Sequence, residues 1–279
     1  MLLLFRILSV LPLWLLHGVG TLLGWLAYGL SATYRARLND HAALAGISLA
    51  ERRAAVAQAG CMVTELPRLW FGPPVSVQWD GADVIEAAHA AGRGLLFLTP
   101  HLGCFEITAQ AYAARFAPEH GPITVLYRPA RKRWLAPLIE HARRRDGLAT
   151  APTTLAGVRQ LLRALRAGQA VGLLPDQVPP AGQGTWAPFF GRDAYTMTLA
   201  ARLASQTGCA VLLAWGERLS AGCGYTVHVQ PLQGDLAPQD APATAQINAA
   251  MESLIRKRPQ QYLWGYARWK APRDESGTQ

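Results

Sequence analysis

The sequence has few cysteines and no pattern typical of a metal site. Its 279 residues include four cysteines, Cys61, Cys104, Cys209 and Cys223, and none forms a CxxC pair. A structural zinc site needs closely spaced Cys or His ligands, so we expect no metal. A chain of this length needs no disulfide to supplement its core. We therefore expect free thiols that face a reducing compartment.

Charged residues are also scarce, at 16% of the chain against 51% hydrophobic residues. This composition fills a core and is more apolar than a freely soluble enzyme needs. The formal net charge is +9, from 27 Lys and Arg minus 18 Asp and Glu. A basic, apolar protein suggests an anionic membrane, a nucleic acid, or an acidic carrier or substrate as partner. The charge is spread out and no nucleic-acid-binding motif is present, so we expect no nucleic acid partner.

The N-terminal region has the longest stretch without charge. Residues Ile7 to Tyr34 contain no Asp, Glu, Lys or Arg. Because about 20 apolar residues span a bilayer as a helix, we predict a hydrophobic membrane-anchoring helix over residues 1–36. The stretch is too long for a signal peptide and has no good cleavage site. A buried helix is one alternative, and Pro12 and His17 leave open a helix that lies within one leaflet.

Beyond the anchor, apolar strand patterns alternate with helical patterns. Such alternation is typical of an α/β fold whose sheet is covered by helices on both faces, and two strands around "SAGCG" read as a hairpin. We predict a mixed, mainly parallel sheet in one domain over residues 37–273, followed by a loose tail over 274–279. The expected helices cover 48–71, 82–91, 105–116, 133–145, 155–167, 197–206 and 245–258; the expected strands cover 75–79, 94–99, 123–127, 170–176, 210–218 and 224–232, with a loop over 177–195.

A histidine and a glutamate follow one of these buried strands. His101 comes directly after "LLFLTP", and Glu106 comes five residues later. Ligand sites in such sheets lie at the carboxyl ends of the strands. If His101 lies in the turn before a helix, the Glu106 carboxylate can reach one ring nitrogen and leave the other to act as a base. The alternative is a loop histidine and a glutamate that favours a helix N-terminus.

The segment "HLGCFE" matches the HxxxxD/E motif of glycerolipid acyltransferases. More specifically, the chain resembles the late, lauroyl or myristoyl, acyltransferases of lipid A biosynthesis in Gram-negative bacteria. The resemblance covers nearly the whole chain, because several motifs occur in the right order. They lie at 101–106, 125–145, 161–177, 187–218 and 259–270.

The resemblance implies an activity and a location. The family uses a fatty acyl thioester on acyl carrier protein as donor and a hydroxyl of a lipid A precursor as acceptor. It implies a protein of the inner membrane whose catalytic domain faces the cytoplasm. It also implies that His101 is the general base and that Glu106 assists it.

Further residues take roles from the same resemblance. Arg143 occupies the place of a functionally important family arginine, with Arg144 and Arg145 as neighbouring alternatives. Asp176 matches an acidic residue that follows a buried strand, and Arg128 belongs to a basic run suited to substrate phosphates or an acidic carrier. We predict Arg128, Arg143 and Asp176 as substrate-binding residues.

A hydroxyl is a poor nucleophile near neutral pH, so a positioned base is the main chemical requirement and no cofactor is needed. Cys104 offers a rival route through an acyl-cysteine, although Cys is commonly a buried apolar residue. Two other functions stay open. One is acyl transfer to another glycolipid or a lysophospholipid, from acyl-CoA. The other is a non-catalytic, basic, membrane-associated binding protein.

Overall fold

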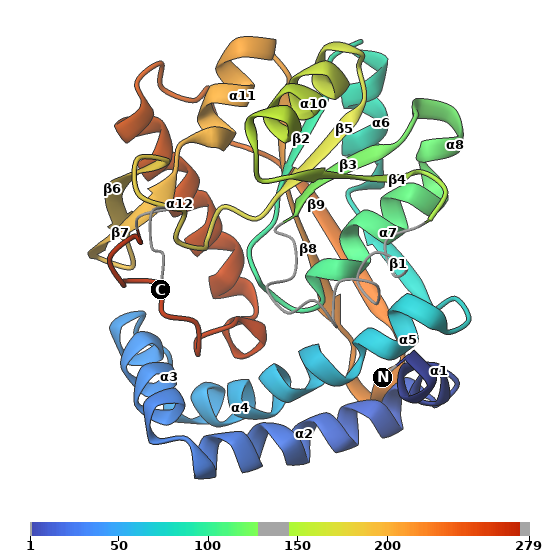
Figure 1. The fold of residues 1–279 in the computed structure, drawn as a ribbon, viewed down its shortest axis with the longest axis vertical. Coiled ribbons are helices and arrows are strands. Elements are labelled where there is room, and N and C mark those ends of the chain that lie inside the picture. Colours follow the sequence, from blue (N-terminus) through green and yellow to red (C-terminus); the bar gives the residue numbers. More distant parts are fainter. Residues whose placement is uncertain (1, 128–144, 274–279) are drawn as a thin grey trace.

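The computed structural model describes residues 2–127 and 145–273. An α/β core carries helices from the N-terminal part of the chain along one end (Figure 1). Some predictions concern residues outside these ranges. They are the roles of Arg128 and Arg143, nearly all of the helix over 133–145, and the tail over 274–279.

The N-terminal apolar stretch forms more than one helix. Helix α1 (Leu2–Ser9) ends before Pro12, and α2 (Leu13–Leu30) begins after it. A proline lacks the backbone N–H that a helix interior needs, so the two cannot join as one regular helix. Ser31 then separates α2 from α3 (Ala32–Leu44). The predicted N-terminal apolar helix is therefore present as α2, with narrower bounds than residues 1–36, and α1 and the start of α3 occupy the rest of that range.

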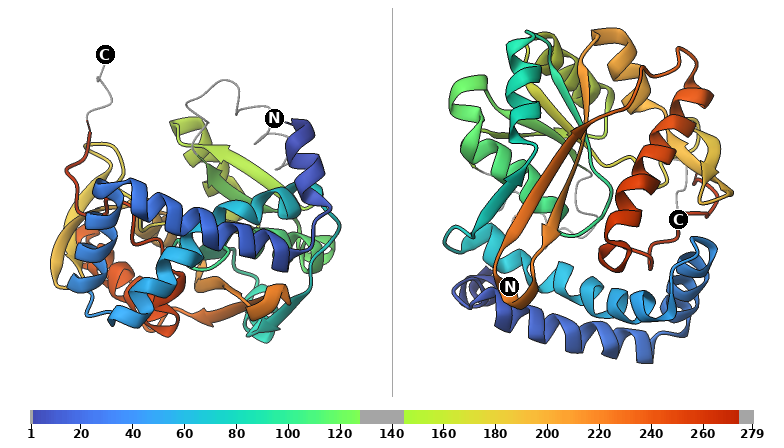
Figure 2. Two further views of the ribbon diagram at one scale, coloured as in Figure 1. Left: turned by 90° about the horizontal axis from the view of Figure 1, so that it is seen from below. Right: turned by 180° about the vertical axis from the view of Figure 1, so that it is seen from behind.

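Helix α2 is long and apolar enough to cross a membrane, the one such helix among the described residues, with 28% of its length buried. It runs antiparallel along α4 (Leu49–Thr64), as Figures 1 and 2 show. Small residues allow the close approach, because Gly20 and Gly24 face Gly60. A Cβ atom added to Gly24 would lie 2.2 Å from the Val56 carbonyl oxygen. One side of α2 is thus fixed to the fold, and the other is exposed.

The central sheet is mixed and mainly parallel, as predicted. Its strand order is β1-β9-β8-β2-β5-β3-β4, and the β8–β9 pair alone is antiparallel. Strand β4 was not among the predicted strands. The strands are β1 (Val77–Asp80), β2 (Leu95–Leu98), β3 (Ile123–Tyr127), β4 (Leu148–Pro152), β5 (Ala170–Leu173), β8 (Ala210–Arg218) and β9 (Tyr225–Pro231).

Apolar side chains project from both faces of the sheet and form two cores. In β2, Leu96 and Leu98 join the core beneath α10, α11 and α12, while Leu95 and Phe97 join the core beneath α6 and α7. Burial on both faces explains why β2 reads as a continuous apolar run. The remaining α-helices of the described residues are α5 (Leu66–Phe71), α6 (Ala82–Ala90), α7 (Phe105–Arg115), α8 (Ala117–His120), α10 (Leu155–Arg166), α11 (Leu199–Thr207) and α12 (Asp240–Lys257).

The predicted loop over 177–195 is wrong in its second half. Strands β6 (Gly184–Phe189) and β7 (Arg192–Met197) form an antiparallel hairpin there. Its two turn residues, Phe190 and Gly191, have φ of 50° and 75°, as a tight two-residue hairpin turn requires. A hydrogen bond helps to hold Phe190 in this conformation, because its backbone N–H donates to Glu252 Oε1 at 2.7 Å.

Candidate active site

His101 and Asp176 meet because their strands are neighbours. Strands β2 and β5 are parallel, and Leu98 is paired with Leu173. His101 lies three residues after Leu98 (101 − 98), and Asp176 lies three residues after Leu173 (176 − 173). Both residues therefore lie just beyond the carboxyl ends of adjacent strands, where ligand sites of α/β sheets lie.

Asp176 holds the histidine through two hydrogen bonds. The His101 Nδ1 lies 2.7 Å from Asp176 Oδ1, and the His101 backbone N–H donates to Asp176 Oδ2 at 2.9 Å. A carboxylate accepts hydrogen bonds, so it fixes the tautomer with a proton on Nδ1 and a lone pair on Nε2. The arrangement is an Asp–His dyad whose Nε2 can accept a proton.

The Asp176 carboxylate is almost completely buried, with 2% of its side chain exposed. Burial by itself would raise the pKa of Asp176, but the His101 ring and the two hydrogen bonds lower the pKa below its ordinary value. Asp176 is therefore ionised near neutral pH and suited to orient an imidazole that gains positive charge.

The sequence analysis paired His101 with Glu106, and the structure differs on this point. The carboxylate on Nδ1 belongs to Asp176, which we had expected to bind substrate. The physical reason is the strand order, because β5 lies directly beside β2 and brings its own acidic residue to the ring. Sequence spacing alone favoured the nearer glutamate.

Gln177, to which the sequence analysis gave no role, contacts the other ring nitrogen. Its amide Nε2 lies 3.0 Å from His101 Nε2. The signal that could have found it is its place directly after Asp176, at the end of a buried strand. The His101 ring also packs on Phe105, with 4.8 Å between ring centroids.

Backbone hydrogen bonds fix the turn that carries His101. The His101 carbonyl accepts from Leu263 N–H at 3.1 Å, and Gly103 N–H donates to the Gln261 carbonyl at 2.9 Å. Gly103 has a φ of +60°, and a Cβ atom there would lie 2.0 Å from the Gly216 carbonyl oxygen. Glycine is therefore required in "HLGCFE", because a side chain has neither the conformation nor the space.

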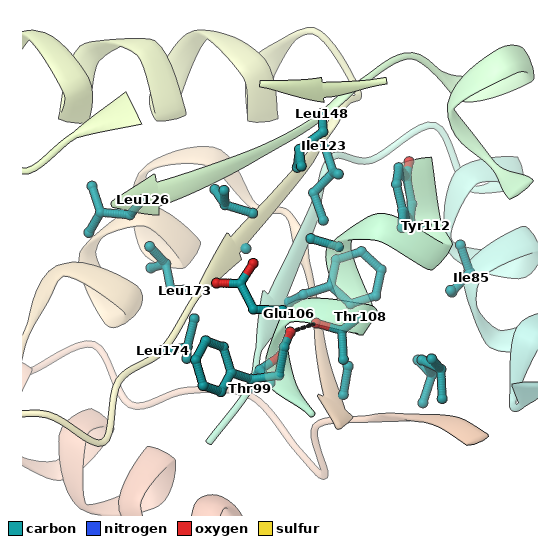
Figure 3. Close-up of a pocket in the computed structure, with 18 of the residues that line it drawn as sticks. Ile85, Thr99, Glu106, Thr108, Tyr112, Ile123, Leu126, Leu148, Leu173 and Leu174 are labelled. Atoms are coloured by element: carbon teal, nitrogen blue, oxygen red, sulfur yellow. Dashed lines mark hydrogen bonds between the residues drawn. The ribbon is translucent and has the colours of Figure 1, made fainter. Parts of the chain in front are cut away.

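Glu106 lies in the first turn of α7 and lines an apolar pocket beside the dyad. Figure 3 shows its carboxylate among apolar side chains that include Leu173. Phe105 lines the same pocket and also contacts His101, so the Phe105 ring lies between the pocket and the imidazole. Its other lining residues include Ile85, Phe97, Tyr112, Ile123, Leu126 and Leu148.

Of the three arginines considered for the family position, Arg145 alone is described. Burial lowers the pKa of the Arg145 guanidinium, and the Glu106 carboxylate opposes that shift. The two charges are therefore close enough to interact. Arg145 also donates to the Leu69 carbonyl, which holds the arginine beside α5.

Cys104 is unsuited to the rival acyl-cysteine route. It is 2% exposed, and burial raises the pKa of its thiol well above the ordinary value. A thiolate is the reactive form, so this cysteine is a poor nucleophile. Within residues 2–127 and 145–273, no cluster of three or more His, Cys, Asp or Glu side chains is arranged to hold a metal ion.

Comparison with known proteins adds the family. Residues 1–271 match the family model described as bacterial lipid A biosynthesis acyltransferase. The chain belongs to this family. It is 26% identical over 216 residues to the lipid A biosynthesis palmitoleoyltransferase of Escherichia coli (strain K12), an alignment that covers 76% of this chain and 68% of the relative.

Two further relatives from Escherichia coli (strain K12) are similar at the same level. The lipid A biosynthesis lauroyltransferase is 26% identical over 219 residues, covering 76% of this chain and 69% of the relative. The lipid A biosynthesis myristoyltransferase is 26% identical over 256 residues, covering 85% of this chain and 74% of the relative. The resemblance noted in the sequence is confirmed at the level of this lipid A acyltransferase family.

Proposed function

We propose that the chain transfers a fatty acyl group from an acyl carrier protein thioester to a hydroxyl of a lipid A precursor. His101 is the general base in this proposal. The observation that carries it is the His101–Asp176 dyad at the carboxyl ends of β2 and β5, beside an apolar pocket, in a member of the lipid A acyltransferase family.

The dyad is suited to activate an alcohol. His101 Nε2 accepts the hydroxyl proton while the alcohol oxygen attacks the thioester carbonyl carbon. Asp176 stabilises the imidazolium that forms, and the proton then passes to the departing sulfur. A positioned general base contributes about 10²–10⁴-fold in rate. In this proposal Asp176 takes the orienting part that the sequence analysis gave to Glu106.

The pocket beside Phe105 is suited to the fatty chain of the donor. Its lining is mainly aliphatic and aromatic, which favours a hydrocarbon over water. Glu106 is the acidic residue among the lining residues, and it lies at the end of α7 nearest the dyad. We assign the pocket to the acyl chain and Glu106 to the catalytic region at its mouth.

We further propose that α1 and α2 rest on the cytoplasmic leaflet of the inner membrane. The side of α2 away from α4 exposes large apolar side chains, among them Leu22 (72%), Leu26 (55%) and Leu30 (78%). Because α4 binds the other side along its length, α2 lies against the domain and its apolar face suits a membrane surface. This favours the in-plane alternative over a spanning helix.

The test of the proposed activity uses purified protein, a tetraacylated lipid A precursor and acyl donors on either acyl carrier protein or coenzyme A. We expect a product whose mass has increased by one acyl group, formed faster from the carrier protein thioester. Transfer from coenzyme A alone would contradict the donor. Transfer to a lysophospholipid and not to the lipid A precursor would contradict the acceptor.

A further inference from the structure

Gln177 engages the lone pair that the proposed base requires. Its amide nitrogen lies 3.0 Å from His101 Nε2. Asp176 accepts the proton of Nδ1, so Nε2 is an acceptor and the Gln177 amide N–H is the donor. The acceptor hydroxyl of a substrate must present its own proton to the same lone pair.

An imidazole nitrogen has a single in-plane lone pair, so two donors cannot align with it together. The Gln177 amide must therefore leave Nε2 when the hydroxyl arrives. An amide donor that loses its partner in this partly buried site is destabilised unless it finds another acceptor. A small rotation of the Gln177 side chain must therefore bring its amide N–H to another acceptor.

The neighbourhood allows the side chain to move while its backbone stays in place. Asp176 on one side is held by His101, and on the other side the Val178 N–H donates to the Tyr266 hydroxyl at 3.0 Å. Gln177 itself is only partly buried. Rotation about its side-chain bonds can therefore shift the amide without disturbing the loop.

We propose that Gln177 is a catalytic residue, whose amide passes from His101 Nε2 to the thioester carbonyl oxygen and stabilises the oxyanion there. This inference rests on the proposed function. The attacking oxygen occupies the place beside Nε2 that the amide has left, so the carbonyl under attack, and its oxygen, come next to the displaced amide. Donors aimed at such an oxygen are among the largest contributions to catalysis.

The hydroxyl proton moves to Nε2, the alcohol oxygen bonds to the carbonyl carbon, and the carbonyl electron pair moves onto the oxygen that accepts from Gln177. When the carbonyl re-forms, the carbon–sulfur bond breaks and the sulfur takes the proton from Nε2. The products are an ester and a free thiol.

The test compares Gln177→Ala and Gln177→Glu with the unaltered chain in the transfer assay. Glutamate keeps the size of the side chain but has no N–H to donate when ionised. We expect both variants to lower kcat by about 10²–10³-fold with little change in KM, because loss of one oxyanion donor has this magnitude. Gln160→Ala is the matched control, since the Gln160 amide donates to the Thr150 carbonyl on β4, away from the dyad.

The outcomes separate the two proposals. If the unaltered chain transfers acyl groups and both Gln177 variants do so as fast or faster, this inference is overturned and the proposed function stands. Absence of transfer by the unaltered chain overturns both. Thermal melting of each variant, measured beside Gln160→Ala, shows whether a lost rate reflects lost folding. A variant that melts like the control and loses kcat supports the inference.

Discussion

The proposed chemistry depends on two different nitrogens of one imidazole. Asp176 fixes Nδ1 as the protonated nitrogen, and Nε2 keeps the lone pair. The aspartate is 2% exposed, so its charge is poorly screened by water at the ring. An asparagine at this position would keep the shape but lose the charge and can present an N–H to Nδ1.

We therefore predict that Asp176→Asn lowers kcat by about 10²–10⁴-fold, the contribution expected of a positioned base. The change should be at least as harmful as Glu106→Gln, because the Asp176 carboxylate contacts Nδ1 of the ring directly. Glu86→Gln is a control that breaks a carboxylate–histidine pair on the surface, Glu86 with His120 at 3.1 Å. Steady-state rates of the three variants provide the measurement. A normal rate for Asp176→Asn would contradict the orienting role.

Among the residues of the candidate site, His101, Glu106 and Asp176 stay sequence predictions. The sequence pairs the ring with Glu106, whereas in the structure Asp176 lies against Nδ1. Spacing along the chain brings Glu106 near His101, and no feature of the sequence states that β5 lies beside β2. That strand order brings Asp176 and Gln177 to the His101 ring, a contact that the sequence did not predict for either residue.

Among the elements, a buried ion pair joins the end of α4 to the end of β8 and to the turn that carries His101. Arg218 binds Glu65 through two hydrogen bonds of 2.6 and 2.7 Å, with both side chains 1% exposed. Burial by itself would raise the pKa of Glu65, but Arg218 and His17 lower it to about 2. Arg218 also donates to the Gly103 carbonyl at 3.2 Å.

Removal of one member of this pair should be costly. We predict that Glu65→Gln lowers the free energy of unfolding by about 3–5 kcal/mol, because it leaves a buried guanidinium without its counter-charge. The control is Asp240→Asn, which breaks the exposed Arg202–Asp240 pair and should change stability by about 0–1 kcal/mol. Chemical denaturation measures both variants. Equal effects would contradict the importance assigned to the buried pair.

The sequence predicted best the elements with a strong local signal. Strands β2 and β5 are continuous apolar runs, and α4 begins at a capping box formed by Ser48 and Glu51. Strand β4 was missed because "LATAP" is partly exposed, has no continuous apolar run and contains proline. The β6–β7 hairpin was missed because its turn uses Phe190 and Gly191, a pair without the usual Asn-Gly signal.

Across the whole molecule, α1 and α2 lie along one end of the domain (Figure 2). Both helices expose large apolar side chains. We predict that Leu22→Lys combined with Leu26→Lys releases the protein from membranes, because charge on this face opposes insertion into the leaflet. Leu155→Lys, at a residue 79% exposed on α10, is the matched control and should remain bound. Sedimentation with anionic vesicles measures the difference, and equal pelleting of both proteins would contradict the membrane face.

The central claim is that the His101 imidazole removes the proton from the acceptor hydroxyl. The most direct measurement is the rate of ester formation on the lipid A precursor by the unaltered chain and by His101→Ala, each checked for an unchanged melting temperature. We predict efficient transfer by the unaltered chain and a loss of at least about 10²-fold in the variant. Transfer by a folded His101→Ala protein at the unaltered rate would contradict the account.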